Sequence, residues 1–151
     1  MVPVDNTQPT KAHGTSYFGK VASDISTLFN FDYPASLAGK TCTLIFLFPT
    51  RDKLVTSNYT LSGPSSSANV AFGFLNGPAT ESTTHATMPG ATGQWHLREL
   101  AAGNNNAIAS FQCPAGTRQG YVMQSNGGGA GLFEWFQDFN PEAIGLYVSA
   151  C

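Results

Sequence analysis

The segment from Ser26 to Pro49, STLFNFDYPASLAGKTCTLIFLFP, constrains the fold more than any other part of the chain. Alternate residues of a β-strand share a face, and residues 41–48 are apolar on both faces. Such a strand belongs in the interior of a sheet, with each side covered. The more strongly apolar face consists of Cys42, Leu44, Phe46 and Phe48. Residues 26–33 predict a partner strand, and we expect the two strands to form a central hairpin, with Pro34 and Pro49 at the strand ends.

Short strands separated by Gly, Pro and Asn recur along the rest of the chain at intervals of roughly 8–12 residues. No window shows a sustained helical pattern. The sequence therefore predicts an all-β protein, an antiparallel β-sandwich in Greek-key or jelly-roll style with roughly nine to eleven strands. We expect residues 15–151 to form this single domain and the polar residues 1–14 to form a flexible N-terminal tail. Residues 126–129, Asn-Gly-Gly-Gly, predict a mobile loop tip.

Charge and hydropathy argue against several classes of protein. Charged residues are 11% of the chain, well below the roughly 25% of an average soluble domain. The Lys and Arg residues are scattered and the formal net charge is −2, which argues against binding to nucleic acid. No apolar run approaches the roughly 20 residues of a membrane-spanning helix. The start of the chain has two interpretations: a cytosolic protein, or a secreted one in which Met1 replaces a removed signal peptide. We favour the second.

Three cysteines allow one disulfide and one unpaired thiol. Cys151 follows the apolar strand Ile144–Val148, where a bridge would hold an end that otherwise frays. Chain reversals between Cys113 and Cys151 place these two at opposite ends of the sheet. We therefore expect a Cys42–Cys151 disulfide, with Cys113 as the alternative partner of Cys42. Three buried, unpaired thiols are a further alternative, and the spare cysteine leaves the choice between a monomer and a disulfide-linked dimer open.

Motifs for catalysis are missing from the sequence. It contains no GxSxG, HExxH, P-loop or GxGxxG pattern, so we expect a protein that is not an enzyme and has no cofactor or metal centre. Glu134 and Asp138 share a strand face but lie roughly 13 Å apart on it, too far for either glycosidase mechanism. Asp138, Asn140 and Glu142 offer oxygens for a calcium ion at a turn. A turn with solvent-facing carboxylates is the preferred interpretation of these three residues.

Aromatic side chains supply the candidates for a binding surface. We assign the phenylalanines to the core. Trp and Tyr combine an apolar ring with a polar edge and recur where sugar rings or partner side chains stack. The candidates of this kind are Trp95, Trp135, Tyr59 and Tyr121, with Tyr17 as a further one. Asn58 begins an Asn-Tyr-Thr sequon, which makes it a candidate for N-glycosylation on the surface.

Four blocks of the sequence resemble a known family: TLFNFDYP, AGKTCTLIFLFP, FQCPAG and FEWFQDFNPEAIGLYVSAC. Their order and spacing are similar to the C-terminal domain of the But family, the fungal Uba-three-binding proteins, across residues 20–151, with a poorly matched middle at residues 62–100. The resemblance implies a small secreted or cell-wall-associated protein, and it carries over no catalytic residues. It also implies a structural role for the three matching cysteines. The matching polar residues, which we assign to turns and strand ends, are Asp32, Gln137, Asp138, Asn140 and Pro141.

Three functions are compatible with these observations. The first is a secreted, non-enzymatic β-sandwich that binds a protein or a glycan at the fungal cell wall or at a host surface. An alternative is a carbohydrate-binding or carbohydrate-active module that uses Trp95 or Trp135. A second alternative, suggested by the family name, is an intracellular partner of the machinery that activates a ubiquitin-like modifier.

Overall fold

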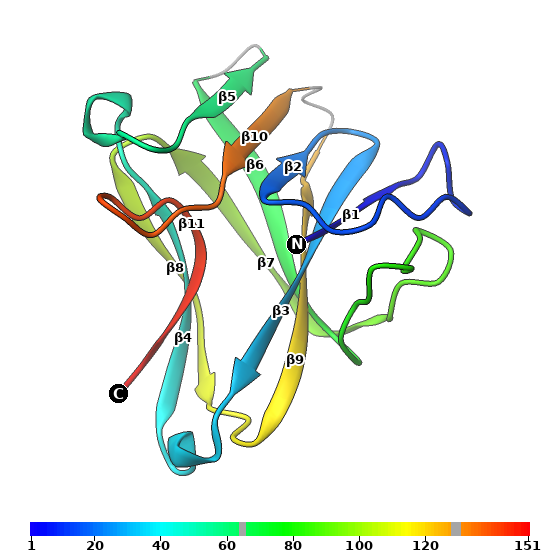
Figure 1. Cartoon of the computed structure of the whole chain (residues 1–151), viewed down its shortest axis with the longest axis vertical. Coiled ribbons are helices and arrows are strands. Elements are labelled where there is room, and N and C mark those ends of the chain that lie inside the picture. Colours follow the sequence, from blue (N-terminus) through cyan, green and yellow to red (C-terminus); the bar gives the residue numbers. More distant parts are fainter. Residues whose placement is uncertain (64–65, 128–130) are drawn as a thin grey trace.

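The computed structural model describes residues 1–63, 66–127 and 131–151, so part of the predicted loop tip at 126–129 lies outside the described residues. Within these ranges the chain forms eleven strands in antiparallel sheets (Figure 1), which confirms the prediction of an all-β sandwich. The strands are β1 (Val2–Asp5), β2 (Phe18–Val21), β3 (Ile25–Tyr33), β4 (Thr41–Phe48), β5 (Tyr59–Ser62), β6 (Ser67–Leu75), β7 (Ala91–Ala101), β8 (Asn104–Gln112), β9 (Thr117–Ser125), β10 (Leu132–Phe136) and β11 (Gly145–Ala150). Two short 3-10 turns are η1 (Ala35–Leu37) and η2 (Arg51–Lys53).

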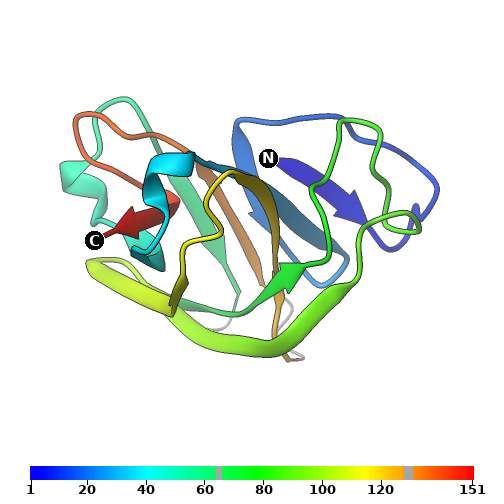
Figure 2. The same ribbon diagram turned by 90° about the horizontal axis from the view of Figure 1, so that it is seen from below.

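The strands form three sheets. One has five strands in the order β1-β3-β9-β6-β7, and two have three strands each, in the orders β2-β10-β5 and β11-β4-β8. Figure 2 shows the sheets around a common interior, with the long β7 curving along one side. Arg98 of β7 links two sheets, because its guanidinium donates hydrogen bonds to the carbonyl oxygens of Ala107 (3.1 Å) and Ile108 (2.7 Å) in β8.

The apolar strand at residues 41–48 is β4, and it lies between β11 and β8 at the centre of its sheet, as predicted. The strongly apolar face is completely buried; it consists of Cys42, Leu44, Phe46 and Phe48. The other face, with Thr43, Ile45 and Leu47, is only half-buried. The expectation that both faces would be covered is therefore wrong for this second face.

The expected central hairpin does not form. β3 pairs with β1 and β9 in the five-stranded sheet, whereas β4 belongs to a different sheet. The connection through residues 34–40 contains η1 and is longer than the two to five residues of most hairpin loops. The chain uses this length to pass from one sheet to another, so β3 and β4 both contribute to the core without pairing.

The main apolar core fills the space between the sheets. Its largest side chain, Trp135, packs with parallel rings on Phe29, with centroids 6.3 Å apart, and edge-on against Phe46 at 5.2 Å. Phe133 stacks on Phe48 at 5.0 Å. Each fully buried large apolar side chain contributes roughly 1.5–3 kcal/mol to folding. This group of rings therefore joins the sheet β2-β10-β5 to the sheet β11-β4-β8.

A second apolar cluster lies on the opposite face of the five-stranded sheet. It consists of Val2, Val4, Leu28, Leu75, Ala79 and Val122. β1 supplies the first two of these and pairs with β3, so the prediction of a flexible tail is wrong for residues 2–5. The loop 76–90 is tied to the sheet by Asn30, whose amide donates to the carbonyl oxygen of Ala79 (2.7 Å) and accepts from its N–H (2.9 Å).

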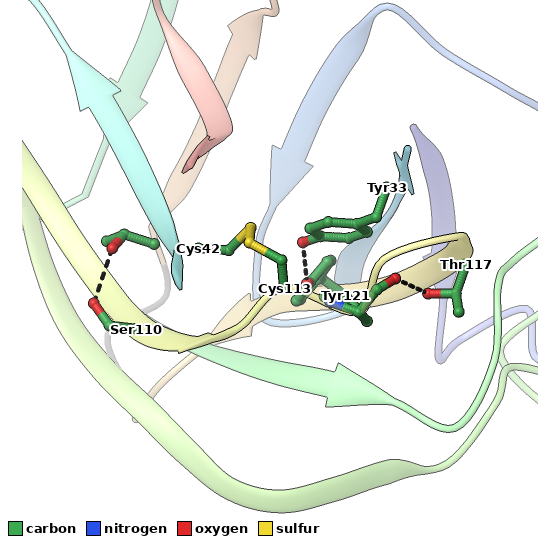
Figure 3. Close-up of a disulfide and its surroundings, with 8 residues drawn as sticks. Tyr33, Cys42, Ser110, Cys113, Thr117 and Tyr121 are labelled. Carbon is green, nitrogen blue, oxygen red and sulfur yellow. Dashed lines mark hydrogen bonds between the residues drawn. A yellow bond between two sulfur atoms is a disulfide. The ribbon is translucent and has the colours of Figure 1, made fainter. Parts of the chain in front are cut away.

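The disulfide joins Cys42 to Cys113 (Figure 3), so the preferred pairing with Cys151 is wrong and the alternative is confirmed. Cys42 lies opposite Phe111 of β8, and Cys113 is two residues further on, which directs it to the same face. In β11 the residue opposite Cys42 is Ala150. Cys151 follows by one residue and faces the other way, where it is exposed and unpaired.

Candidate binding surface

Two of the four predicted binding residues are buried. Trp135 is 0% exposed, and its indole N–H donates a hydrogen bond to Oε1 of Gln137 (2.9 Å). Tyr121 is also 0% exposed, and its hydroxyl lies 2.5 Å from that of Tyr33, beside the disulfide (Figure 3). Burial raises the pKa of Tyr121 and of Tyr33. Neither Trp135 nor Tyr121 can stack on a ligand, so both predictions of a surface role are wrong.

Tyr59 and Trp95 remain partly accessible but lie on different sheets. The ring of Tyr59 is half-buried; it packs edge-on against Phe48 at 4.8 Å, and the guanidinium of Arg51 lies 4.0 Å from its centroid. Trp95 lies on β7 next to Gly73 of β6, where a Cβ would come within 2.7 Å of the indole. The absence of a side chain at Gly73 thus makes room for an indole that lies flat on the sheet.

Two exposed aromatic side chains lie next to each other at one edge of the sheet β2-β10-β5. Tyr17 is 79% exposed and Phe18 49% exposed. The ring of Phe136 lies near both, with its centroid 6.3 Å from that of Tyr17 and 5.3 Å from that of Phe18. We call Tyr17, Phe18 and Phe136 the aromatic patch. The assignment of all phenylalanines to the core is therefore wrong for Phe18, and also for Phe139 in the turn before β11, which is 67% exposed.

Register explains why the aromatic patch faces outward. Phe136 lies opposite Phe18, and Trp135 lies opposite Gly19. Alternate residues face opposite sides of a sheet, so the burial of Trp135 in the core turns Phe136 outward. The sequence carries a signal for this arrangement, because the neighbouring residues Tyr17 and Phe18 cannot both point into the core from one strand.

A groove of about 140 Å³ runs over the outer face of β10, beside the aromatic patch. Its lining residues come from all three strands of the sheet: Phe18 from β2, Glu134 and Trp135 from β10, and Tyr59 and Thr60 from β5, with Asn58 just before β5. Glu134 lies opposite Lys20 on one side and Thr60 on the other. The groove thus combines an aromatic wall with a carboxylate, a hydroxyl and a side-chain amide.

Asn58, the glycosylation candidate, is exposed at the end of this groove. Its Oδ1 accepts hydrogen bonds from the guanidinium of Arg51 (2.5 Å) and from the N–H of Tyr59 (2.8 Å). Both hydrogen bonds involve the oxygen, and none of the hydrogen bonds of the described residues uses Nδ2. The amide nitrogen, which is the atom that N-glycosylation modifies, thus has no hydrogen-bond partner among the described residues.

The calcium candidates Asp138, Asn140 and Glu142 lie in the turn between β10 and β11. Oδ1 of Asp138 accepts a hydrogen bond from the N–H of Phe139 (2.8 Å), and Oδ2 accepts one from the hydroxyl of Thr56. The hydrogen bond from Thr56 is the main cause that holds the pKa of Asp138 below its usual range. The described part of the chain holds no group of three or more His, Cys, Asp or Glu suited to a metal ion. The carboxylate of Asp138 instead fixes the turn.

Gln137 connects β10 to β11 inside the C-terminal block. Its Oε1 accepts hydrogen bonds from Trp135 and from the N–H of Leu146 (3.2 Å), and its Nε2 donates to the carbonyl oxygen of Leu146 (2.8 Å). Gly145 has φ +120°, and a Cβ there would overlap the amide of Gln137. This part of the block therefore has a structural role, which agrees with its assignment to turns and strand ends.

These features describe an all-β fold with an exposed aromatic patch and a small groove on the outer face of one sheet. A family model described as "Ubiquitin 3 binding protein But2 C-terminal domain" matches residues 1–141. The chain belongs to this family, as the sequence blocks predicted, and the match includes the N-terminal residues that form β1. No curated protein and no solved structure matches the chain. No helix among the described residues is long and apolar enough to cross a membrane.

Proposed function

We propose that the chain is a secreted, non-enzymatic module that binds a partner at the fungal cell wall or at a host surface through the aromatic patch. The observation that carries the proposal is the exposure of Tyr17 and Phe18 on a sheet whose other face is packed into the core. Exposed clusters of aromatic rings are typical of recognition surfaces. Trp95, the exposed candidate on the five-stranded sheet, lies on a second surface that is separate from the aromatic patch.

Secretion is supported by the buried disulfide between Cys42 and Cys113. Stable disulfides form in oxidising compartments and are rare in the cytosol. Thiol titration of the protein recovered from its native source, denatured without reductant, tests this part of the proposal. We expect one reactive thiol, from Cys151; three reactive thiols would contradict secretion.

Binding is tested by incubating the folded chain with isolated fungal cell walls and measuring the fraction that sediments. The double variant Tyr17→Ala/Phe18→Ala should lose most of this binding, because each buried aromatic contact at an interface contributes roughly 1–2 kcal/mol. Trp95→Ala is the matched control, since it removes an exposed aromatic from a different sheet. If Trp95→Ala abolishes binding and the double variant does not, the assignment of the surface is wrong.

The family description favours a second candidate, a protein partner in a ubiquitin-like pathway. Under this alternative the chain works inside the cell and its cysteines are reduced. Direct titration with the purified activating enzyme of a ubiquitin-like modifier distinguishes the two. Saturable binding together with three free thiols in the native protein would favour the intracellular function.

A further inference from the structure

We infer that the groove on the outer face of β10 binds a single pyranose ring of a saccharide. This inference rests on the proposed function and names the chemistry of its ligand. The groove has a volume of about 140 Å³, and its lining residues are Phe18, Asn58, Tyr59, Thr60, Glu134 and Trp135. It is smaller than the roughly 300 Å³ at which pockets for drug-sized ligands begin, and it suits one ring-sized unit.

The lining of the groove matches the two kinds of surface that a sugar ring presents. The faces of a pyranose carry C–H groups, which pack on an aromatic ring such as Phe18. The edge of a pyranose carries hydroxyls, each of which donates and accepts hydrogen bonds. Glu134 supplies a carboxylate acceptor, Thr60 a hydroxyl, and Nδ2 of Asn58 a donor that makes no hydrogen bond to any described residue.

The polar groups of the groove are available to a ligand. The one ion pair among the described residues joins Arg118 and Asp32. Glu134 and Lys20 lie opposite each other on β10 and β2 but do not form a salt bridge. Hydrogen bonds from sugar hydroxyls to a carboxylate are stronger than those to a neutral acceptor, because the carboxylate is charged. The ring of Phe18 is held edge-on against Phe136, at a centroid distance of 5.3 Å and an interplanar angle of 68°.

The same features disfavour a peptide as the occupant. A peptide that docks on a sheet pairs its backbone with an edge strand or lays apolar side chains into a continuous apolar groove. This groove lies on the central strand, β10, whose backbone is already paired with β2 and β5. Its apolar lining comes from Phe18, Tyr59 and Trp135, and Glu134 and Thr60 interrupt this apolar surface.

The saccharide has two possible sources. One is a glycan outside the protein, such as a cell-wall polysaccharide. The other is the protein's own N-linked glycan, since Asn58 both begins the sequon and lines the groove. The chemistry in the groove is the same in the two cases, and only an attached glycan would occupy it permanently.

The first arm of the test uses the chain made in bacteria, where Asn58 is unmodified. Isothermal titration with soluble β-1,3-glucan, chitin and mannan hexasaccharides should show saturable binding to one of them. Phe18→Ala and Glu134→Gln should each weaken it about tenfold, which corresponds to about 1.4 kcal/mol. Leu97→Ala is the control, because it removes an exposed apolar side chain from β7 in a different sheet, and it should change binding less than twofold. Binding that survives both groove substitutions would overturn the inference.

The second arm uses the chain secreted from yeast with a glycan on Asn58. If this glycan occupies the groove, its enzymatic trimming to the bare protein should lower the melting temperature of the wild type but not of Phe18→Ala. Absence of saccharide binding in the first arm together with no Phe18-dependent change in the second would overturn the inference. Cell-wall binding through Tyr17 would still stand in that case, so failure of the groove and failure of the proposed function are distinguishable.

Discussion

Removing the disulfide between Cys42 and Cys113 should reduce the free energy of unfolding by about 4 kcal/mol, whereas removing the thiol of Cys151 should change it little. The bridge joins residues with a sequence separation of 71. For a loop of this size the bridge lowers the entropy of the unfolded chain by about 15 cal/mol/K, which corresponds to about 4.4 kcal/mol at 25 °C. Both bridged cysteines are buried, so substitution by Ala adds a further, smaller loss of packing.

Urea unfolding, followed by tryptophan fluorescence, measures this difference. The variants are Cys42→Ala/Cys113→Ala and Cys151→Ala, each compared with the wild type with and without reductant. We expect the double variant and the reduced wild type to lose similar stability, with a drop in melting temperature of roughly ten degrees. Reductant should leave the double variant unchanged. A Cys151→Ala variant as unstable as the double variant would refute the pairing and the register argument behind it.

Three further predictions concern packing and ionisation. Gly19→Ala should destabilise the protein by about 2 kcal/mol, since a Cβ there would overlap the indole of Trp135; an unchanged urea midpoint would contradict this packing. Thr56→Val should raise the pKa of Asp138 toward 3.8 in an NMR titration. The stabilisation that this substitution removes is present above the unfolded pKa of Asp138 and is lost as pH falls through the folded pKa. If the pKa of Asp138 is the same in the variant and the wild type, the hydrogen bond from Thr56 is excluded. The raised pKa of Tyr121 should make stability fall as pH rises above 10.0, and Tyr121→Phe should flatten that decline; an equally steep decline would contradict it.

Strand patterns in the sequence predict the all-β class and the central place of residues 41–48, because apolar alternation is a local property. They do not predict which strands pair. Residues 26–33 and 41–48 are neighbours in the chain and look like a hairpin, yet they lie in different sheets. The disulfide shows the same limit: the choice between Cys113 and Cys151 depends on a one-residue offset in register, and register requires the complete sheet.

Site prediction fails for a related reason. Alternation shows which residues share a face but not which face meets the core. Trp95 and Trp135 are equivalent by residue type and by position in a strand, but the first lies outside on β7 and the second is fully buried. For Tyr17 and Phe18 the sequence does indicate exposure, since two consecutive aromatic residues at an edge strand leave at least one ring exposed.

The outer face of the sheet β2-β10-β5 is suited to recognition because it is exposed while the opposite face of the same sheet is packed into the core. Along β10, Phe133 and Trp135 point into the core, and the alternate residues Glu134 and Phe136 point outward. The buried residues therefore hold the outward ones in place. Ordering a mobile side chain at an interface costs roughly 0.5–1.5 kcal/mol. Phe18 is already held by Phe136, so a ligand on this face avoids much of that cost, and substitutions of outward residues should reduce binding without unfolding the protein.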